Sequence, residues 1–348
     1  MTASVVGIDI GTAGLRAVEV SDAGRNNPTL VRYHEVQLPD GAVIRGEVVE
    51  PNTVAAALKS LWAGGGFKSK KVVLGMGNHR VLARDLTVPK MSIERIRESL
   101  PFQAQDMLSV PVADALLDFY PISESDGENG PEIYGLLIAA VKEAVLGNIM
   151  AVQIAGLTPV EVDLIPFALS RVINRSSKSD GAVVQIDVGV ATTTVAVTLD
   201  GVPQFLRLIP AGGGDLTQAL ALRLDVTPDV AEALKRSLGL GKASNPQQQG
   251  AATVISEVTN ELLSSLRNTV NYFINTRNHM AVTRIVLTGG GAQLGGFSNA
   301  LSELTRLPVF TADLAAAVVL GNGVDADALQ QTQGAYSVAL GLALGSKK

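Results

Sequence analysis

The sequence of 348 residues contains no cysteine and has few aromatic residues and few charges. The absence of cysteine excludes a disulfide framework and thiolate chemistry, and it fits a reducing compartment. Aromatic residues make up 4% of the chain and charged residues 18%, whereas hydrophobic residues make up 47%. This balance argues against long disordered segments and predicts an aliphatic core, of the kind found in sheets covered by helices.

Positive charge is also scarce. The chain has 28 Lys and Arg against 33 Asp and Glu, which gives a net charge of −5. No nucleic-acid partner is therefore expected, because such proteins usually present a basic face. The three histidines, His34, His79 and His279, lack metal-ligand spacing. Neither a G-x-S-x-G hydrolase elbow nor a Walker lysine loop is present.

Long hydrophobic runs are missing as well. The longest nearly uncharged run, Ala144–Asp163, contains Glu161 and is broken by Gly156 and Pro159, so it is unsuited to span a bilayer. The N-terminus leads directly into a predicted strand, without the pattern of a signal peptide. We therefore expect a cytoplasmic protein without direct membrane insertion. Its length allows two domains.

Hydrophobic periodicity predicts alternating strands and helices along the whole chain. Strands are predicted at Val5–Ile10, Leu15–Val20, Leu30–Val36, Lys71–Met76, Val81–Val88, Leu116–Ile122, Glu132–Val141, Val160–Asp163, Ala182–Val188, Thr192–Leu199, Val202–Ile209 and Arg284–Thr288. Helices are predicted from Pro51, over Ile93–Met107 with a kink or two abutting helices at Pro101, and over Lys142–Gly156, Phe167–Val172, Gly214–Leu224, Pro228–Leu238, Val254–Asn278, Gly295–Leu304 and Gly334–Leu344. Loops are predicted at Ser123–Pro131, Asn174–Gly181 and Gly239–Ala252.

The strongest signal is an internal repeat. The segment that begins at Val5 reads as a buried strand ending in Asp9, a glycine turn and a second strand, and the chain repeats this pattern around Asp187. Identical residues recur at one constant offset: Val5, Val6, Ile8, Asp9, Gly11 and Ala13 align with Val183, Val184, Ile186, Asp187, Gly189 and Ala191. A single hairpin of this kind is common, but its repetition predicts two related halves with a shared purpose.

Two such hairpins facing each other predict a site for a polyphosphate. Backbone N–H groups of a glycine turn form an anion nest, and glycine permits close approach of the phosphate oxygens. The residues expected to contribute are Gly11, Thr12, Ala13 and Gly14 in the first turn, and Gly189, Thr192 and Thr193 in the second. Asp9 and Asp187 would repel phosphates unless Mg²⁺ lies between them, most readily held through water. Arg16 supplies a charge-assisted donor.

Two further glycine segments fit the same site. In Arg284–Gly296, a strand leads into Gly289, Gly290 and Gly291 and then, past Leu294, into a helix. This arrangement provides a flat backbone surface and a positive helix end, which suit the base and ribose of a nucleotide. Gly212, Gly213 and Gly214 at another helix start form a fourth candidate.

This combination of motifs resembles the superfamily of actin-like ATPases, which includes actin, Hsp70, FtsA and sugar kinases. Asp9–Arg16 is similar to its first phosphate motif, Asp187–Thr194 to its second and Gly289–Gly291 to its adenosine motif. Within the superfamily, the chain resembles the PilM-type type IV pilus assembly proteins. This closer resemblance is carried by Gly7–Glu19, by Val162 and Asp163 with Ala168 and Arg171, by Arg207 followed by Gly212, Gly213, Leu216 and Thr217, and by Ala231–Lys235.

The resemblance implies an α/β fold with duplicated actin-like (ribonuclease-H-like) domains, a nucleotide cleft between them and an inserted α+β subdomain of the FtsA/PilM type. The expected first domain comprises residues 1–37, 157–176 and 334–348; the insert comprises 38–156, and the second domain 177–333. It also implies ATP or ADP with Mg²⁺ as ligands. Glu232 and Lys235 match residues that contact the ribose and base in related proteins.

The resemblance further implies a cytosolic ATP-binding scaffold of pilus assembly. Such a scaffold binds the N-terminal cytosolic peptide of a PilN-like inner-membrane protein and other assembly components, and it can form homo-oligomers. Partners would recruit it to the inner face of the cytoplasmic membrane, with the peptide in a groove between the insert and the first subdomain. Two residues depart from the family: Arg16 replaces the usual lysine, and Ile165 stands at the position of an acidic residue. Because isoleucine cannot orient water, slow or absent hydrolysis is expected.

Two alternatives remain open at this point. An FtsA-like, filament-forming protein of cell division or the cytoskeleton would carry a C-terminal linker and an amphipathic membrane helix. This chain instead ends at Lys348, shortly after a predicted core helix. A small-molecule kinase of the same superfamily needs a general base beside a substrate hydroxyl, for which the sequence offers no persuasive candidate.

Overall fold

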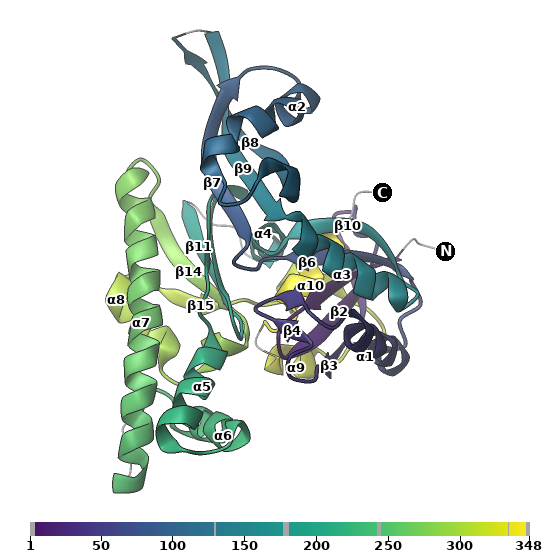
Figure 1. Ribbon diagram of the computed structural model, residues 1–348. Helices are drawn as coiled ribbons and strands as arrows, with labels where there is room; N and C mark the ends of the chain where they lie inside the picture. The colour runs from purple at the N-terminus through teal and green to yellow at the C-terminus, as the bar shows by residue number, and fades with distance from the viewer. Residues whose placement is uncertain (1–3, 129, 177–180, 242–244, 333, 346–348) are drawn as a thin grey trace.

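The computed structural model describes residues 4–128, 130–176, 181–241, 245–332 and 334–345. Figure 1 shows three bodies: one at the right, which carries both marked termini, one at the left along a long helix, and a smaller one above. Each body is built around its own sheet of three or more strands. Among the described residues, none of the helices combines the length and the apolar character needed to cross a membrane.

The first sheet holds the first predicted hairpin at its centre. Its order is β10-β6-β1-β2-β3-β16. The strands are β1 (Ser4–Ile10), β2 (Gly14–Ser21), β3 (Thr29–Gln37), β6 (Lys71–Met76), β10 (Thr158–Leu164) and β16 (Val319–Leu320). Val6 and Ile8 pack with α1 (Pro51–Gly65) and α3 (Lys142–Ile154), whereas Val5 packs with α4 (Ile165–Ser176) and α10 (Ser337–Gly345). Helices therefore cover both faces, because neighbouring strand residues point to opposite sides.

The second sheet holds the repeated hairpin. Its order is β13-β12-β11-β14-β15. The strands are β11 (Ala182–Val188), β12 (Thr193–Leu199), β13 (Val202–Ile209), β14 (Val282–Thr288) and β15 (Val309–Thr311). The long helix α7 (Pro246–Thr276) and α8 (Phe297–Thr305) cover one face, where Phe273 and Phe297 pack on Ile186 and Ile285. On the other face, Ile173 of α4 packs on Val183 and Val286, so α4 lies between the two sheets.

Two helices extend the second body at one end. α5 (Gly213–Leu224) and α6 (Pro228–Leu238) lie below the sheet in Figure 1, beside the N-terminal half of α7. Leu216 and Leu220 of α5 and Ala231 of α6 form a buried cluster with Val254 and Ile255 of α7. Both helix starts agree with the sequence: Pro228 begins α6, and the Asp215 side chain accepts a hydrogen bond from the Gly212 N–H at the start of α5.

The third body is an antiparallel sheet within the predicted insert. Its order is β7-β9-β8, with β7 (Val81–Pro89), β8 (Ala115–Gly127), β9 (Gly130–Val141) and the helix α2 (Ile93–Gln103) on one face. Of the kink or two abutting helices expected at Pro101, the structure has two abutting helices: α2 ends at Gln103, two residues after Pro101, and a 3₁₀ helix follows at Gln105–Met107.

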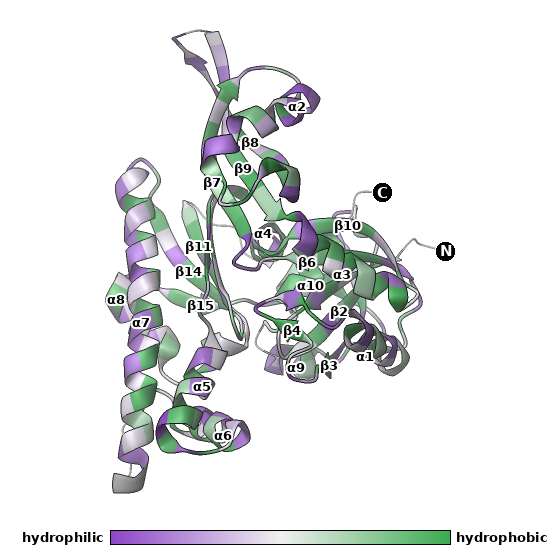
Figure 2. Cartoon of the chain, viewed as in Figure 1, coloured by the Kyte–Doolittle hydropathy of each residue, from purple (hydrophilic) through white to green (hydrophobic). Residues whose placement is uncertain are grey.

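The predicted loop Ser123–Pro131 is wrong for most of its length. The β8–β9 ladder continues until Gly127 faces Gly130, so most of the predicted loop is paired strand. Figure 2 shows hydrophilic residues concentrated at this hairpin tip. The residues of this segment are as polar as those of a loop. The segment is nevertheless extended, because its backbone pairs with β9.

The predicted loop Gly239–Ala252 is also wrong, from Pro246 onward. Helix α7 begins there, and the Asn245 side chain caps it by accepting a 2.9 Å hydrogen bond from the Gln248 N–H. Ala251 is buried against α5, so packing stabilises this glutamine-rich turn. Residues 242–244 of that loop, and residues 177–180 of the predicted linker Asn174–Gly181, lie outside the described residues; Asn174–Ser176 belong to α4.

Short elements complete the fold without a clear sequence signal. They are β4 (Val43–Ile44), β5 (Glu47–Val48), α9 (Ala326–Gln331) and 3₁₀ helices at Val112–Asp114, Gly290–Gln293 and Ala315–Ala317. The division into domains stays a prediction. Strand β6 lies within the range predicted for the insert, yet it pairs with β1 in the first sheet.

Candidate functional site: a cleft between two hairpins

The two predicted hairpins have the same backbone geometry. In the first, β1 pairs antiparallel with β2, Asp9 faces Arg16, and the Gly11 N–H donates a 3.0 Å bond to the Gly14 carbonyl. In the second, β11 pairs with β12, Asp187 faces Thr194, and the Gly189 N–H donates a 2.9 Å bond to the Thr192 carbonyl. The sequence repeat is therefore a structural repeat, with one carboxylate at the same position of each turn.

The carboxyl groups of Asp9 and Asp187 lie close enough to influence each other. Burial raises the pKa of Asp9 to about 6. The positive charge of Arg16 lowers this pKa, and the negative charge of Asp187 raises it further. Burial also raises the pKa of Asp187, although a hydrogen bond from Thr288 and the charge of Arg16 oppose this effect. Two buried carboxylates, one from each hairpin, form an environment that favours a cation.

These two residues fit a hydrated magnesium ion. Carboxylate oxygens are the ligands that Mg²⁺ prefers, and the ion usually keeps several of its waters beside substrate phosphates. The described residues contain no group of three or more metal-ligating side chains. Asp9 and Asp187 would thus hold Mg²⁺ together with water, and the ion would neutralise phosphate charge that the two carboxylates otherwise repel.

Arg16 lies beside Asp9 but has a second partner. Its Nη1 is 4.0 Å from Asp9 Oδ2, and its Nε donates a 3.1 Å bond to Glu35 Oε2 on the neighbouring strand. Arg16 and Glu35 are register partners in the β2–β3 ladder. Glu35 holds the guanidinium at the edge of the cleft, where a phosphate would compete for it.

The threonines of the second turn do not all face the cleft. Thr193 is buried, and its hydroxyl donates a 2.7 Å bond to the carbonyl of Ala211. Thr192 is half-buried at the turn, as is Thr12 in the first hairpin. Thr193 is the first residue of β12, and Thr192 lies in the turn before it. The phosphate role of these residues stays a prediction.

Sequence reasoning did not single out Thr288. Its hydroxyl donates a 2.7 Å bond to Asp187 Oδ1, and the parallel pairing of β11 with β14 places the two residues side by side. Thr288 thereby orients the second carboxylate. The signal was present, because Thr288 immediately precedes Gly289 at the end of a strand that the sequence predicts.

The glycine segments converge on the second hairpin. The N–H groups of Gly213 and Gly214 donate to the carbonyls of Gly189 and Val190 at 2.9 and 2.7 Å. These N–H groups are thus already bonded within the protein, and they fix the start of α5 against the turn. A Cβ on Gly213 would lie 3.2 Å from Cα of Gly291, so the third and fourth glycine candidates adjoin each other.

Gly289 connects β14 to the glycine segment in a conformation that requires glycine. Its φ is +86°, and a Cβ there would lie 2.4 Å from the carbonyl oxygen of Val188. Gly290 has no other heavy atom within 4 Å of its Cβ direction, so this backbone is open on one side. Leu294 follows at the end of the 3₁₀ helix and is partly buried. An open glycine backbone beside a hairpin suits a flat ligand, as the sequence predicts.

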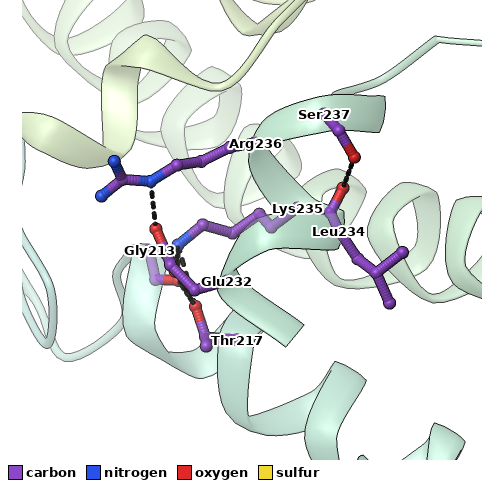
Figure 3. Close-up of polar contacts among 7 residues, drawn as sticks. All are labelled: Gly213, Thr217, Glu232, Leu234, Lys235, Arg236 and Ser237. Atoms are coloured by element: carbon purple, nitrogen blue, oxygen red, sulfur yellow. Dashed lines mark hydrogen bonds and ion pairs between the residues drawn. The ribbon is translucent and has the colours of Figure 1, made fainter. Parts of the chain in front are cut away.

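Glu232 and Lys235 of α6 form a polar cluster with Thr217 of α5 next to these glycines (Figure 3). Lys235 Nζ lies 2.5 Å from Glu232 Oε2 and donates to Thr217 Oγ1 at 2.8 Å and to the Gly213 carbonyl at 3.1 Å. Burial would raise the pKa of Glu232, but hydrogen bonds from Lys235, Thr217 and Arg236 and the charge of Lys235 lower it to about 2. Both predicted residues are therefore held in one polar cluster beside Gly213.

Asp163 and Ile165 occupy positions that do not supply a free carboxylate. Asp163 forms an ion pair with Arg171, and its Oδ1 accepts a 2.7 Å bond from the Leu164 N–H. Ile165 packs over Gly75 and Gly77 at the end of β6.

The chain segment before α10 contacts both main bodies, and sequence reasoning missed it. A Cβ on Gly334 would lie 3.6 Å from the Thr288 methyl group, and the ring of Tyr336 packs edge-on against Tyr33 at 4.9 Å. Burial raises the pKa of Tyr336, and its charged neighbours include Glu35 and Arg16. This segment therefore links the second body to the first beside the phosphate candidates.

Comparisons with known proteins agree with this architecture. The family model of the type IV pilus assembly protein PilM matches residues 7–347. The structure titled PilM-PilN type IV pilus biogenesis complex aligns with a TM-score of 0.86 at 28% identity, covering 99% of this chain and 98% of that one. The cell division protein FtsA of Bacillus subtilis (strain 168) is 24% identical over 351 residues, which cover 86% of this chain and 76% of FtsA.

More distant structures share the fold. The ethanolamine utilization protein EutJ from Carboxydothermus hydrogenoformans aligns with a TM-score of 0.58 at 17% identity, covering 99% of this chain and 91% of that one. MreB 5 of Spiroplasma citri, bound to AMPPNP, aligns with a TM-score of 0.51 at 14% identity, covering 91% and 94%. The predicted actin-like α/β fold is confirmed, and some proteins with this fold have been crystallised with a nucleotide.

Proposed function

This chain belongs to the PilM family of type IV pilus assembly proteins, and we propose that it is a cytosolic nucleotide-binding scaffold for a PilN-like membrane protein. In this role the two main bodies hold ATP or ADP between them. The N-terminal cytosolic peptide of the partner binds in a groove between the insert and the first body. Because that peptide belongs to a membrane protein, binding to it recruits the scaffold to the inner face of the cytoplasmic membrane.

The observation that carries the nucleotide part is the pair of equivalent hairpins. Asp9 and Asp187 lie at matching positions of the two hairpins, and the charge of Asp187 adds to the burial that raises the pKa of Asp9. The open backbone at Gly290 and the charged pair Glu232 and Lys235 adjoin the second hairpin. These features support phosphates between the hairpins and the nucleoside near α5 and α6.

The family and the structural likeness to a PilM-PilN complex support the peptide part. The insert also offers apolar surface. A cavity of about 420 Å³ on it is lined by Pro101, Phe102, Gln105, Val110, Pro111 and Val112. The Phe102 side chain is 83% exposed there, which is unusual for a large apolar residue without a partner. All six lining residues belong to the insert, so this cavity supports an apolar docking surface on the insert's side of the peptide site.

The proposal is tested by binding the N-terminal cytosolic peptide of the source organism's PilN-like protein, with and without MgATP. We expect fluorescence anisotropy to detect peptide binding and a thermal-shift assay to detect MgATP. In Asp187→Ala, nucleotide affinity is expected to fall about 10- to 100-fold, the usual effect of losing a residue that holds a metal through water. Asp118→Asn, which changes an exposed carboxylate of the insert, is the matched control.

A wild-type protein that binds neither ligand contradicts the proposal. The FtsA-like alternative is favoured by the similarity to FtsA. It predicts a different result: nucleotide-dependent filaments that sediment at high speed, with no binding of the PilN-like peptide.

Slow hydrolysis is a separate prediction. Because Ile165 offers no carboxylate and Asp163 is held by Arg171, we expect turnover on the order of 10⁻² s⁻¹ or slower, as in nucleoside triphosphatases without a complete catalytic set. Phosphate release by purified wild type would be compared with Asp187→Ala, which controls for contaminating enzymes. Turnover of several ATP per second that disappears in Asp187→Ala would overturn this prediction.

A further inference from the structure

Arg277 reaches from the second body to the insert. It follows directly after α7, and its Nη2 donates a 2.8 Å hydrogen bond to Asp85 Oδ2 on β7. The same nitrogen donates to the hydroxyl of Tyr134 on β9, and that hydroxyl donates a 2.8 Å bond to Asp85 Oδ1. The three side chains thus form a closed ring of polar contacts between residues that are far apart in sequence.

This contact is better defined than an ordinary surface ion pair. The Arg277 side chain is only 17% exposed, although Asp85 is 55% exposed, and the guanidinium carbon lies 4.9 Å from the centre of the Tyr134 ring. Burial and Asp85 raise the pKa of Tyr134 to about 12, so its hydroxyl keeps its proton at physiological pH. The Arg277 guanidinium is fixed in one geometry, because it stacks on the Tyr134 ring and donates to two acceptors, Asp85 and the Tyr134 hydroxyl. An isolated exposed ion pair is not fixed in this way.

The insert also rests on both main bodies through one apolar cluster. Met76 of β6 and Leu164 of β10 come from the first sheet, Leu136 of β9 from the insert, and Ala196 of β12 and Leu206 of β13 from the second sheet. Because close-packed side chains transmit displacement, this cluster is the pivot on which the insert would move. Arg277 holds the insert directly beside this cluster, because Asp85 faces Leu136 across the β7–β9 ladder.

The direct boundary between the main bodies is more polar. Ser170 of α4 donates a 3.0 Å bond to the Gln185 side chain on β11, which donates a 3.1 Å bond to Thr198 on β12, and all three are buried. Asn174 at the end of α4 donates to the Gly201 carbonyl at 3.1 Å. Asp187 follows on the same strand as Gln185. A ligand that displaces Asp187 thus displaces the second body. That body is bonded to α4 by these hydrogen bonds and to the insert by Arg277.

We propose that Arg277, Asp85 and Tyr134 form a latch that couples nucleotide in the cleft to the affinity of the insert for the partner peptide. The inference rests on the proposed function, because it joins the two sites assigned there. When nucleotide draws the two hairpins together, the second body moves, and Arg277 carries the insert with it. The groove between the insert and the first body then changes shape. Without the latch, the insert follows the first body alone.

The proposed contact between the second body and the insert can be tested without ligand. Because the chain has no cysteine, spin labels attach only at cysteines introduced for the purpose. Ser125→Cys on exposed β8 and Ser256→Cys on exposed α7 would carry two spin labels, and pulsed electron resonance would measure the distance between them. We expect a narrow distribution in the otherwise wild-type protein and a broader one in Arg277→Ala. Arg223→Ala is the matched control, because it removes an arginine ion pair with Glu257 within the second body. An unchanged distribution in Arg277→Ala would overturn the latch.

The coupling part uses the PilN-like peptide and MgATP as probes. We expect MgATP to change the peptide dissociation constant at least about fivefold in wild type, and the peptide to change the MgATP constant by the same factor, as linkage requires. In Arg277→Ala, this factor is expected to fall below about twofold. Each ligand measured alone should still bind within about twofold of wild type, as expected for a residue outside both sites.

The outcomes separate the latch from the proposed function. Coupling that persists in Arg277→Ala, or peptide and MgATP that bind wild type without coupling, would overturn the latch and leave the proposed function standing. A wild-type protein that binds neither probe would overturn the proposed function, and with it the coupling. Asp85→Asn should reproduce the loss of coupling while it preserves the shape of the side chain, so a general folding defect would be recognised.

Discussion

Replacing Gly341 with alanine is expected to cost about 2–4 kcal/mol of the free energy of unfolding, at the severe end of single substitutions. Gly341 lies in α10, where every residue from Ser337 to Leu344 is buried. A Cβ at this position would lie 2.0 Å from the carbonyl oxygen and 2.4 Å from the carbonyl carbon of Ala168 in α4. Backbone atoms cannot rotate away as a flexible side chain can, so the two helices would have to separate.

Urea denaturation of the purified proteins measures this effect, and Gly147→Ala provides the matched control. Gly147 also lies within a helix, α3, but a Cβ there would meet its nearest neighbour at 3.4 Å. Since alanine favours helix over glycine, Gly147→Ala should raise the stability by about 0.5–1 kcal/mol. If both variants have similar stability, helix α10 does not pack against α4 as closely as described.

Replacing Asp9 with asparagine is expected to stabilise the ligand-free protein at neutral pH while it removes magnesium-dependent nucleotide binding. The folded protein raises the pKa of Asp9 from 3.8 to about 6, chiefly through burial. Ionised Asp9 therefore opposes folding at pH 7.5, and we expect asparagine to recover about 1–3 kcal/mol. The same substitution removes one of the two carboxylates that would hold Mg²⁺, so MgATP should no longer stabilise the variant.

The pH dependence has a defined sign. Between pH 3.8 and about 6, the folded state binds more protons at Asp9 than the unfolded state does. The contribution of Asp9 to stability is therefore fully present below pH 3.8 and is lost as the pH rises through about 6. The difference between Asp9→Asn and wild type should shrink to about a third between pH 7.5 and pH 4.5.

Urea denaturation at both pH values, with and without MgATP at about 100 times its dissociation constant, measures these effects. Wild type should gain about 2.7 kcal/mol from the ligand, and Asp9→Asn almost none. Asp118→Asn serves again as the control, and its exposed pair with Arg97 should change stability by about 0.5 kcal/mol or less. An Asp9→Asn protein that is less stable than wild type at pH 7.5 without ligand would contradict the assignment.

The sequence by itself determined the features that depend on neighbours along the chain. A hairpin with a glycine turn closes within a few residues, so Asp9 and Asp187 could be placed at equivalent positions from their repeated context. Helix starts at Pro51 and Pro228 and the helix end at Gly66, which has a left-handed φ of +61°, obey local backbone rules. The repetition of these local units predicted two related halves, and the resemblance of the motifs to actin-like ATPases implied the architecture.

Only the tertiary structure decided which polar groups are free and which are already bonded. Thr193 and the N–H groups of Gly213 and Gly214 looked available in the sequence, but they bond to carbonyls that a different turn or strand brings to them. Thr288 acquired its role because β14 lies beside β11, and Arg277 because the insert folds back onto the second body. Such partners come from distant parts of the chain, and their pairing depends on the packing of whole sheets, for which no local pattern exists.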